Sequence, residues 1–395
     1  MKKIIYLDNA ATTKPKQEVV DAMVPYFTSY YGNASTVYEL GSESKKAIAI
    51  ARDTIAKALN TTSDTIYFTA GGSESDNWAL KSVCDAYGEQ GGHIITSKIE
   101  HHAILHTCEY LEKQGFDITY LDVDENGVVD LQQLEDSIRE DTLLISIMFA
   151  NNEIGTIEPI KEIGAIAKKH KILFHTDAVQ AFGQISIDVE ELGIDLLSAS
   201  GHKVYGPKGI GFLYIRKGVK IKSFVHGGAQ ERNRRAGTEN VPAIVGFGKA
   251  VELAMGNLQD RMDKESKLRD YLIAQITERI PYTKVNGHLT DRLPNNVNVC
   301  FRFIEGESLL IMLDMRGICG SSGSACTSGS LDPSHVLLAI GLPHEIAHGS
   351  LRLTLSDETT KEELDETVDA LVQIVERLRS MSPLYEDYMK KEGNE

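Results

Sequence analysis

Short apolar runs alternate with amphipathic stretches between Thr65 and Arg216. The apolar runs have the length of strands and read TIYFTA, HIITS, LLISIMFA and ILFHTD. The stretches between them place apolar residues at helical spacing, as in ESDNWALKSVCDAY, EHHAILHTCEYLEK and PIKEIGAIAKKH. Strand followed by helix, repeated along the chain, predicts right-handed crossovers. The expected fold is α/β, with a mostly parallel central sheet and helices on both of its faces.

The pattern changes near Gly256. A polar helix is predicted over residues 258–280, and shorter strands such as NNVNVCF follow it. Such a change of element type indicates a second hydrophobic core. We therefore predict a large domain over residues 15–256 and a smaller α+β domain that combines residues 1–14 with residues 257–395.

The last predicted element is an amphipathic helix. A Thr360-x-x-Glu363 capping box opens it. Its apolar positions recur at helical spacing: Leu364, Val368, Leu371, Val375 and Leu378. We interpret this helix as scaffold for the smaller domain.

Composition narrows the class of protein. With 395 residues, 42% hydrophobic and 25% charged, the chain has the makeup of a folded globular protein. No segment approaches the roughly 18 apolar residues of a membrane span, and the first apolar run stops at Asp8, too soon for a secretory signal. Five cysteines without a CxxC pair favour a reducing compartment, so we expect a cytoplasmic protein.

A net charge of −16 argues against nucleic-acid binding.

Candidate chemistry gathers just after the predicted strands. In a parallel α/β sheet, ligands bind beyond the carboxyl ends of the strands. The residues at those positions are Gly71-Gly72-Ser73, His101, Asn151-Asn152, Asp177 with Gln180, and Ser200-Gly201-His202-Lys203. Taken singly, a strand-end Asp is more often a helix cap and a lone His more often an ordinary core or surface residue. Taken together, these residues match the separate needs of one aldehyde cofactor.

Such a cofactor needs an amine and a carboxylate. Lys203 lies among small residues in SASGHKVYGPKG, where a lysine can be partly buried and form a Schiff base. Asp177 closes the buried strand ILFHTD and can pair with a protonated pyridine nitrogen. His101 can lie over the ring and move protons beside the reacting carbon.

A phosphate group needs backbone N–H donors at the start of a helix. The turn at Gly71, Gly72 and Ser73 stands between a predicted strand and a predicted helix, and so provides them. Ser200 and His202 can add donors. Residue chemistry by itself predicts a cofactor site without naming the reaction.

The motifs resemble a known family. SGHKVYGPKG, HTDAVQAFG, MFANNEIG, TAGGSESDN, IEHHA, GGAQERNRRAGTEN and SSGSACTSGSLDPSHVL are similar to motifs of cysteine desulfurases of the NifS and IscS type. These enzymes belong to the class V aminotransferases, fold-type I enzymes that depend on pyridoxal 5'-phosphate. The resemblance runs from LDNAATT near residue 7 to HGSLRLTLS near residue 356. It departs from the common family pattern at Ala34, Tyr38 and Gly201, which bears on substrate entry.

The resemblance implies a role for each motif residue. Lys203 would form the Schiff base, Asp177 would pair with the pyridine nitrogen, and Gln180 would hydrogen-bond the phenolic oxygen. His101 would stack on the ring. The phosphate would be held by a larger group: Gly72, Ser73, Ser200, His202 and, from the partner subunit of a homodimer, Thr238. Asn152 would contact the cofactor and, with Arg352, the carboxylate of L-cysteine, to which a guanidinium fork is well suited.

Among the five cysteines, Cys326 is the candidate nucleophile. Cys84, Cys108, Cys300 and Cys319 stand in or beside apolar patterns, where a cysteine usually acts as a small buried hydrophobe. Cys326 stands in a run of small polar residues with little to bury, which we expect to be mobile. Its thiolate would attack the substrate sulfur, leaving a persulfide on Cys326 and L-alanine. The bland alternative is a flexible connection that happens to hold a cysteine.

Several alternatives stay open at this point. A selenocysteine lyase or a class V aminotransferase can use the same fold, and an inactive interaction protein could keep it. His344-Glu345-Ile346-Ala347-His348 spells the HExxH zinc pattern, but Gly349 follows at once and we expect no metal site beyond a transient iron–sulfur contact at Cys326. The expected sulfur acceptor is an iron–sulfur scaffold protein or a tRNA-thiolating protein.

Overall fold

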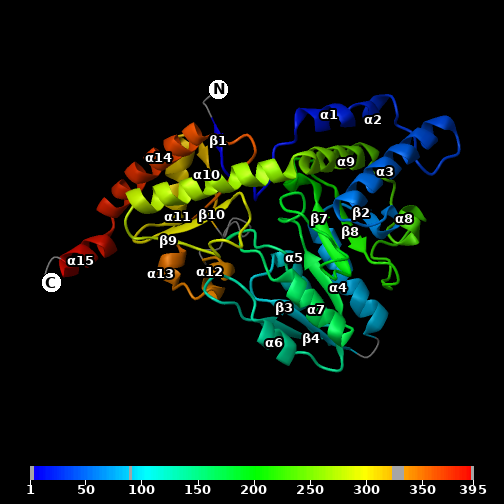
Figure 1. The fold of residues 1–395 in the computed structure, drawn as a ribbon, viewed down its shortest axis with the longest axis horizontal. Coiled ribbons are helices and arrows are strands. Elements are labelled where there is room, and N and C mark those ends of the chain that lie inside the picture. The colour runs from blue at the N-terminus through cyan, green and yellow to red at the C-terminus, as the bar shows by residue number, and fades with distance from the viewer. Residues whose placement is uncertain (1–3, 89–90, 323–332, 393–395) are drawn as a thin grey trace.

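A seven-stranded sheet forms the centre of the larger part of the molecule (Figure 1). The structure, a computed structural model, describes residues 4–88, 91–322 and 333–392. The strand order is β2-β8-β7-β6-β5-β3-β4. The bounds are β2 (Ile66–Thr69), β3 (His93–Ser97), β4 (Asp117–Leu121), β5 (Thr142–Ser146), β6 (Leu173–Asp177), β7 (Leu196–Ser200) and β8 (Gly211–Ile215).

The predicted parallel pairing is confirmed from β7 through β6, β5 and β3 to β4. The first strand of the predicted alternation differs, because β2 pairs antiparallel with β8, and β8 pairs antiparallel with β7. Only residues 201–210 connect β7 to β8. A link this short permits an antiparallel return but no crossover, which sets the direction of β8.

Helices cover both faces of this sheet, as the alternation predicts. The helices in this part are α1 (Gln17–Met23), α2 (Pro25–Thr28), α3 (Glu39–Ala58), α4 (Gly72–Tyr87), α5 (His102–Glu112), α6 (Leu131–Asp136), α7 (Ile160–His170), α8 (Gln230–Asn233) and α9 (Val241–Gly256), with short 3-10 turns at Ser63–Thr65 and Gly201–Lys203. Successive side chains of a strand point to opposite faces of the sheet, so neighbouring residues belong to different cores. Ile95 and Leu197 belong to the core beneath α3, α7 and α9, whereas Ile94 and Leu196 belong to the core beneath α4 and α5.

The smaller part has its own sheet and core (Figure 1). Strand β10 (Asn296–Phe301) lies between β9 (Thr283–Val285) and β12 (Ser350–Thr354), both antiparallel to it, and β1 (Ile5–Tyr6) pairs in parallel with β11 (Ile318–Cys319). Its helices are α10 (Leu258–Arg279), α11 (Gly306–Met315), α12 (His335–Ala339), α13 (His344–Ala347), α14 (Lys361–Ser380) and α15 (Pro383–Glu392).

The N-terminal segment packs with the C-terminal part of the chain. Ile5 and Leu7 are buried in the same cluster as Leu272, Val299 and Leu371. This packing supports the predicted combination of the first residues with residues 257–395, and the domain boundaries stay a prediction.

The final amphipathic helix is confirmed as α14. Thr360 Oγ1 accepts the Glu363 N–H at 3.3 Å, and a Glu363 carboxylate oxygen accepts the Thr360 N–H at 3.1 Å. Four of its five predicted apolar positions are fully buried, and the fifth, Leu378, packs against them. Across the described residues, no helix has both the length and the apolar run that a membrane crossing needs.

Candidate active site

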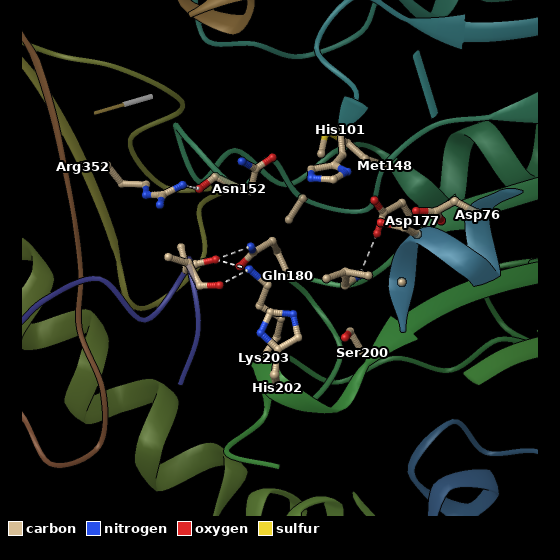
Figure 2. A pocket seen from close by; sticks show the side chains of 16 residues that line it. Asp76, His101, Met148, Asn152, Asp177, Gln180, Ser200, His202, Lys203 and Arg352 are labelled. Atoms are coloured by element: carbon tan, nitrogen blue, oxygen red, sulfur yellow. Dashed lines mark hydrogen bonds between the residues drawn. The ribbon is translucent and has the colours of Figure 1, made fainter. Parts of the chain in front are cut away.

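A cavity of about 290 Å³ opens at the carboxyl ends of β6 and β7 (Figure 2). It brings together ten of the predicted site residues: Gly72, Ser73, His101, Asn152, Asp177, Gln180, Ser200, His202, Lys203 and Arg352. Ala10 and Ala11, from the start of the chain, also line the cavity. Residues from the start of the chain, the large sheet and β12 therefore meet in one place.

Lys203 stands at the end of the 3-10 turn that follows β7. Its Nζ donates to the carbonyl oxygen of Ala11 at 2.9 Å and also to that of Ala10 (Figure 2). Gln180 Nε2 donates to the same Ala10 oxygen at 3.0 Å. Backbone carbonyls thus hold the amine inside the cavity, beside the amide predicted to contact the cofactor.

Asp177 is the last residue of β6, and its side chain points into the cavity from the sheet (Figure 2). It is only 5% exposed, and one carboxylate oxygen accepts the Val179 N–H at 2.9 Å. Burial raises the pKa of Asp177 to about 6, against the opposing effects of the Val179 hydrogen bond and the Lys203 charge. A buried carboxylate of this kind gains from pairing with a cation.

His101 caps the N-terminus of α5 with its ring directed into the cavity (Figure 2). Its Nδ1 accepts the Ala103 N–H at 3.1 Å, which assigns the hydrogen of the neutral ring to Nε2. Burial, followed by the charges of Lys203, His102 and His106, lowers the pKa of His101 to about 4. The imidazole is therefore neutral at physiological pH.

The start of α4 forms one end of the cavity. Its N-cap residue, Gly71, has φ +154°, and a Cβ added to Gly72 would lie 2.6 Å from Val179 Cγ2. Glycine at position 72 thus lets the first turn approach the connection after β6. Free N–H groups of a 16-residue helix, together with Ser73 and Ser200, face the same space.

Arg352 approaches the cavity from β12 with a guanidinium that is 4% exposed. Nη2 pairs with Asp8 Oδ1 at 3.0 Å, and Nη1 donates to the backbone oxygen of Asn152 at 3.1 Å. Within the part of the chain that the structure describes, Arg352 Nε has no hydrogen-bond partner. Asp8 and the Asn152 carbonyl oxygen thus fix the guanidinium at the wall of the cavity.

Thr238 does not lie in this cavity. It is exposed and lines a separate cavity of about 250 Å³ with Thr69, Gly209 and Arg235. The predicted role of Thr238 is to contact the phosphate bound by the partner subunit. Its position away from the cavity of its own chain therefore does not test that prediction.

Cys326 lies outside the described residues, but both described ends of its segment are attached beside the cavity. Ser321 and Arg352 exchange backbone hydrogen bonds of 3.0 and 2.6 Å. At the other end, the Ser334 hydroxyl donates to the Glu153 carboxylate, and His335 Nε2 lies 3.0 Å from the carbonyl oxygen of Glu100, which precedes His101.

Three of the other four cysteines are buried, as the sequence predicts. Cys84, Cys108 and Cys300 are buried, and burial raises the pKa of all three thiols, to about 12 for Cys84 and about 11 for Cys300. Cys319 is half-buried and its thiol pKa is also raised by burial. Such thiols are poorly suited to nucleophilic attack.

The HExxH pattern spans one helical turn, in which the His348 N–H donates to the His344 carbonyl oxygen. Helix α13 contains His344 and ends at Ala347, before His348. Among the described residues, no group of three or more His, Cys, Asp or Glu side chains is suited to hold a metal ion.

Six of the residues that line the cavity were not predicted from the sequence, among them Asp76 and Met148. Asp76 could have been found, because it occupies the apolar face of its helix, three and four residues before the buried Ala79 and Leu80. A carboxyl group at a core position of an amphipathic helix is a signal for a buried site. Met148 carries no comparable signal.

The fold and the site define a class. The sequence pattern described as "Aminotransferase class-V" matches residues 5–367, and the chain belongs to that family. A solved structure titled "NIFS-LIKE PROTEIN" superimposes with a TM-score of 0.90 at 39% identity, covering 95% of this chain and all of the other. Another, "SspA in complex with cysteine", gives a TM-score of 0.81 at 39% identity, covering 90% of this chain and all of the other.

Curated relatives narrow the class further. "Cysteine desulfurase IscS" of Clostridium botulinum is 57% identical over 392 residues, 99% of each chain. A protein of the same name from Methanosarcina thermophila is 60% identical over 382 residues, 97% of this chain and 94% of that one. Within the class V family, the chain therefore belongs with the cysteine desulfurases. The predicted family is confirmed, and it is favoured over a selenocysteine lyase or another aminotransferase.

Proposed function

We propose that this protein removes sulfur from L-cysteine with pyridoxal 5'-phosphate held in the cavity, and that Cys326 receives the sulfur as a persulfide. The observation that carries the proposal is the meeting, in one cavity, of an amine, a buried carboxylate and a helix N-terminus: Lys203, Asp177 and α4. Each of these groups can bind a different part of the cofactor.

The residues present fit that cofactor. Lys203 would hold its aldehyde carbon and Asp177 its ring nitrogen, while Gln180 would donate to its phenolic oxygen. The phosphate would lie at the first turn of α4, held by Gly72, Ser73, Ser200 and His202, with Thr238 of a second copy. Gly72 and Ser200 line the same end of the cavity, and a Cβ at position 72 would lie 3.8 Å from Ser200 Cβ. When bound, the cofactor supplies an electron sink for bond changes at the substrate carbons.

The remaining steps use side chains of this chain. Arg352 would bind the substrate carboxylate from its place at the cavity, and Asn152 lies beside it. Lys203 and His101 would hold and move the proton at the substrate α carbon. The Cys326 thiolate attacks the substrate sulfur, so that an S–S bond forms as the C–S bond breaks. Protonation of the substrate β carbon and return of a proton to the α carbon then give L-alanine.

The biological setting extends the same proposal. A homodimer would bring Thr238 to the partner's phosphate. The persulfide would pass to an iron–sulfur scaffold protein or another sulfur acceptor, with Cys326 able to contact the nascent cluster. The setting would be the cytoplasm, where low-molecular-weight thiols keep cysteines reduced.

The test measures L-alanine and sulfide released from L-cysteine in the presence of a reductant. Wild type is expected to be yellow and to yield both products in equal amounts. Cys326→Ala is expected to stay yellow and yield neither, whereas the matched control Cys319→Ala keeps both. Retained activity in Cys326→Ala would favour a lyase or an aminotransferase, and a colourless wild type that added pyridoxal phosphate does not change would remove the cofactor assignment.

A further inference from the structure

Asp76 is a buried carboxyl group that the proposed mechanism does not use. It lies in the second turn of α4, is 1% exposed and lines the cavity next to Asp177 (Figure 2). One of its oxygens, Oδ1, has no hydrogen-bond partner among the described residues. A buried ionised carboxylate with an unsatisfied oxygen is costly, so this position needs an explanation.

The sheet beneath Asp76 offers hydroxyls and a neutral ring. His175 Nε2 lies 3.8 Å from Asp76 Oδ1, too far for a hydrogen bond. The two His175 nitrogens instead lie 2.8 Å from Ser146 Oγ and 3.0 Å from Ser198 Oγ. Burial lowers the pKa of His175 to about 3, so the ring is neutral and its approach to Asp76 is not an ion pair.

The two neighbouring carboxyl groups have unequal surroundings. Asp177 receives the Val179 N–H and feels the positive charge of Lys203, and both favour its ionised form. Asp76 is influenced by burial and by the like charges of Asp177 and Glu100, and only a hydrogen bond from Ser198 favours its ionised form. Burial and the adjacent Asp177 therefore raise the pKa of Asp76 well above its ordinary value.

We infer that Asp76 is a positioning residue that stays a neutral carboxylic acid beside Asp177, so that the single negative charge of the pair is kept on Asp177. Two buried carboxyl groups that line one cavity disfavour each other's ionisation, so that the pair keeps one proton. The inference rests on the proposed role of Asp177 at the cofactor ring. It assigns the proton to Asp76 and leaves Asp177 free to meet a cation.

The position of the proton can be measured without the cofactor. We would record infrared spectra of cofactor-free protein containing isotope-labelled aspartate, so that the label separates Asp carboxyl groups from those of Glu. At neutral pH, wild type should show the band of a protonated aspartic acid. The band should vanish in Asp76→Asn and persist in Asp85→Asn, which changes an exposed carboxylate on the same helix. Its absence from wild type, or its persistence in Asp76→Asn, overturns the inference.

A second measurement tests whether the neutral group positions the site. An amide keeps the shape and donor capacity of the protonated acid, whereas alanine removes the side chain that accepts the Ser198 hydrogen bond. Cofactor affinity, titrated by absorbance, should fall about tenfold in Asp76→Ala, the size expected for one lost buried hydrogen bond. Asp76→Asn should stay within about threefold of wild type. Equal weakening in both variants would mean that an ionised Asp76 is required, and would refute the inference.

Different results would refute the proposed function and the inference about Asp76. If wild type binds no pyridoxal phosphate, the proposed function fails, and the infrared band still decides where the proton lies. If wild type binds the cofactor and releases sulfide while Asp76→Asn keeps the band, only the inference about Asp76 fails. Should Asp76→Ala not fold, the infrared comparison with Asp76→Asn remains decisive.

Discussion

Replacing Asp177 by Asn should stabilise the cofactor-free protein at neutral pH, even though it damages the proposed site. Asp177 is 5% exposed, and burial raises its pKa from 3.8 to about 6. Each unit of pKa shift corresponds to about 1.4 kcal/mol. Folding the ionised carboxylate without a cofactor therefore costs about 3 kcal/mol, by the linkage of protonation to unfolding.

The sign of the pH dependence follows from the direction of the shift. The folded protein binds the Asp177 proton more tightly than the unfolded chain does. The cost is therefore absent below the unfolded pKa of 3.8, grows as pH rises toward the folded pKa of about 6, and is complete above it. Asparagine is neutral at every pH and can still accept the Val179 N–H, so the variant avoids this cost.

Urea unfolding of the cofactor-free protein, from about pH 4 to 8, measures the difference between wild type and Asp177→Asn. The variant should be about 3 kcal/mol more stable near neutral pH, with the gap closing toward about pH 4. Asp85→Asn is the control, and its exposed side chain should give no such trend. A gap that does not vary with pH, or a variant less stable than wild type at neutral pH, would refute the reasoning.

Three further predictions concern the substrate and the scaffold. Arg352→Lys keeps the positive charge but loses the planar guanidinium fork. The KM for L-cysteine, measured by steady-state kinetics, should therefore rise about tenfold or more, with a smaller effect on kcat. An unchanged KM would contradict the role of Arg352 in binding the substrate carboxylate. Glu231→Gln breaks a pair in which Glu231 Oε1 lies 2.6 Å from Arg52 Nη2 and Oε2 accepts the Phe68 N–H. Urea unfolding should show a loss of about 3 kcal/mol, against less than about 1 kcal/mol for Glu43→Gln in the exposed pair with Lys46. Leu371→Ala, at a fully buried position of α14, should cost about 2 to 5 kcal/mol, whereas Leu384→Ala, 57% exposed, should cost much less.

Local chemistry in the sequence was enough for the main elements of the fold. The alternation of apolar runs with amphipathic stretches predicted the parallel part of the sheet and the helices on both faces. Strands and helices have different side-chain periods, and each period shows in the spacing of apolar residues close together in the sequence. The same holds for α14 and its capping box. Lys203 and Asp177 could be named because each directly follows or closes a strand, and the end of a strand fixes where its next side chain lies.

The strand pairing of β2 could not be predicted in the same way. Its direction depends on β8, which lies well over a hundred residues later in the chain, and on the short return that reverses β8 after β7. Sequence periodicity reports the face of a strand but carries no information about which strand lies next to it.

The sequence by itself determined the α/β class and the candidate chemistry at the strand ends, and it predicts Cys326 as the nucleophile. Only the tertiary structure decided that Asp8 holds Arg352, that the carbonyls of Ala10 and Ala11 hold Lys203, and that Asp76 lies beside Asp177. The reason is that such contacts join residues far apart in the chain, and their charge, burial and hydrogen bonding exist only once the folded elements meet.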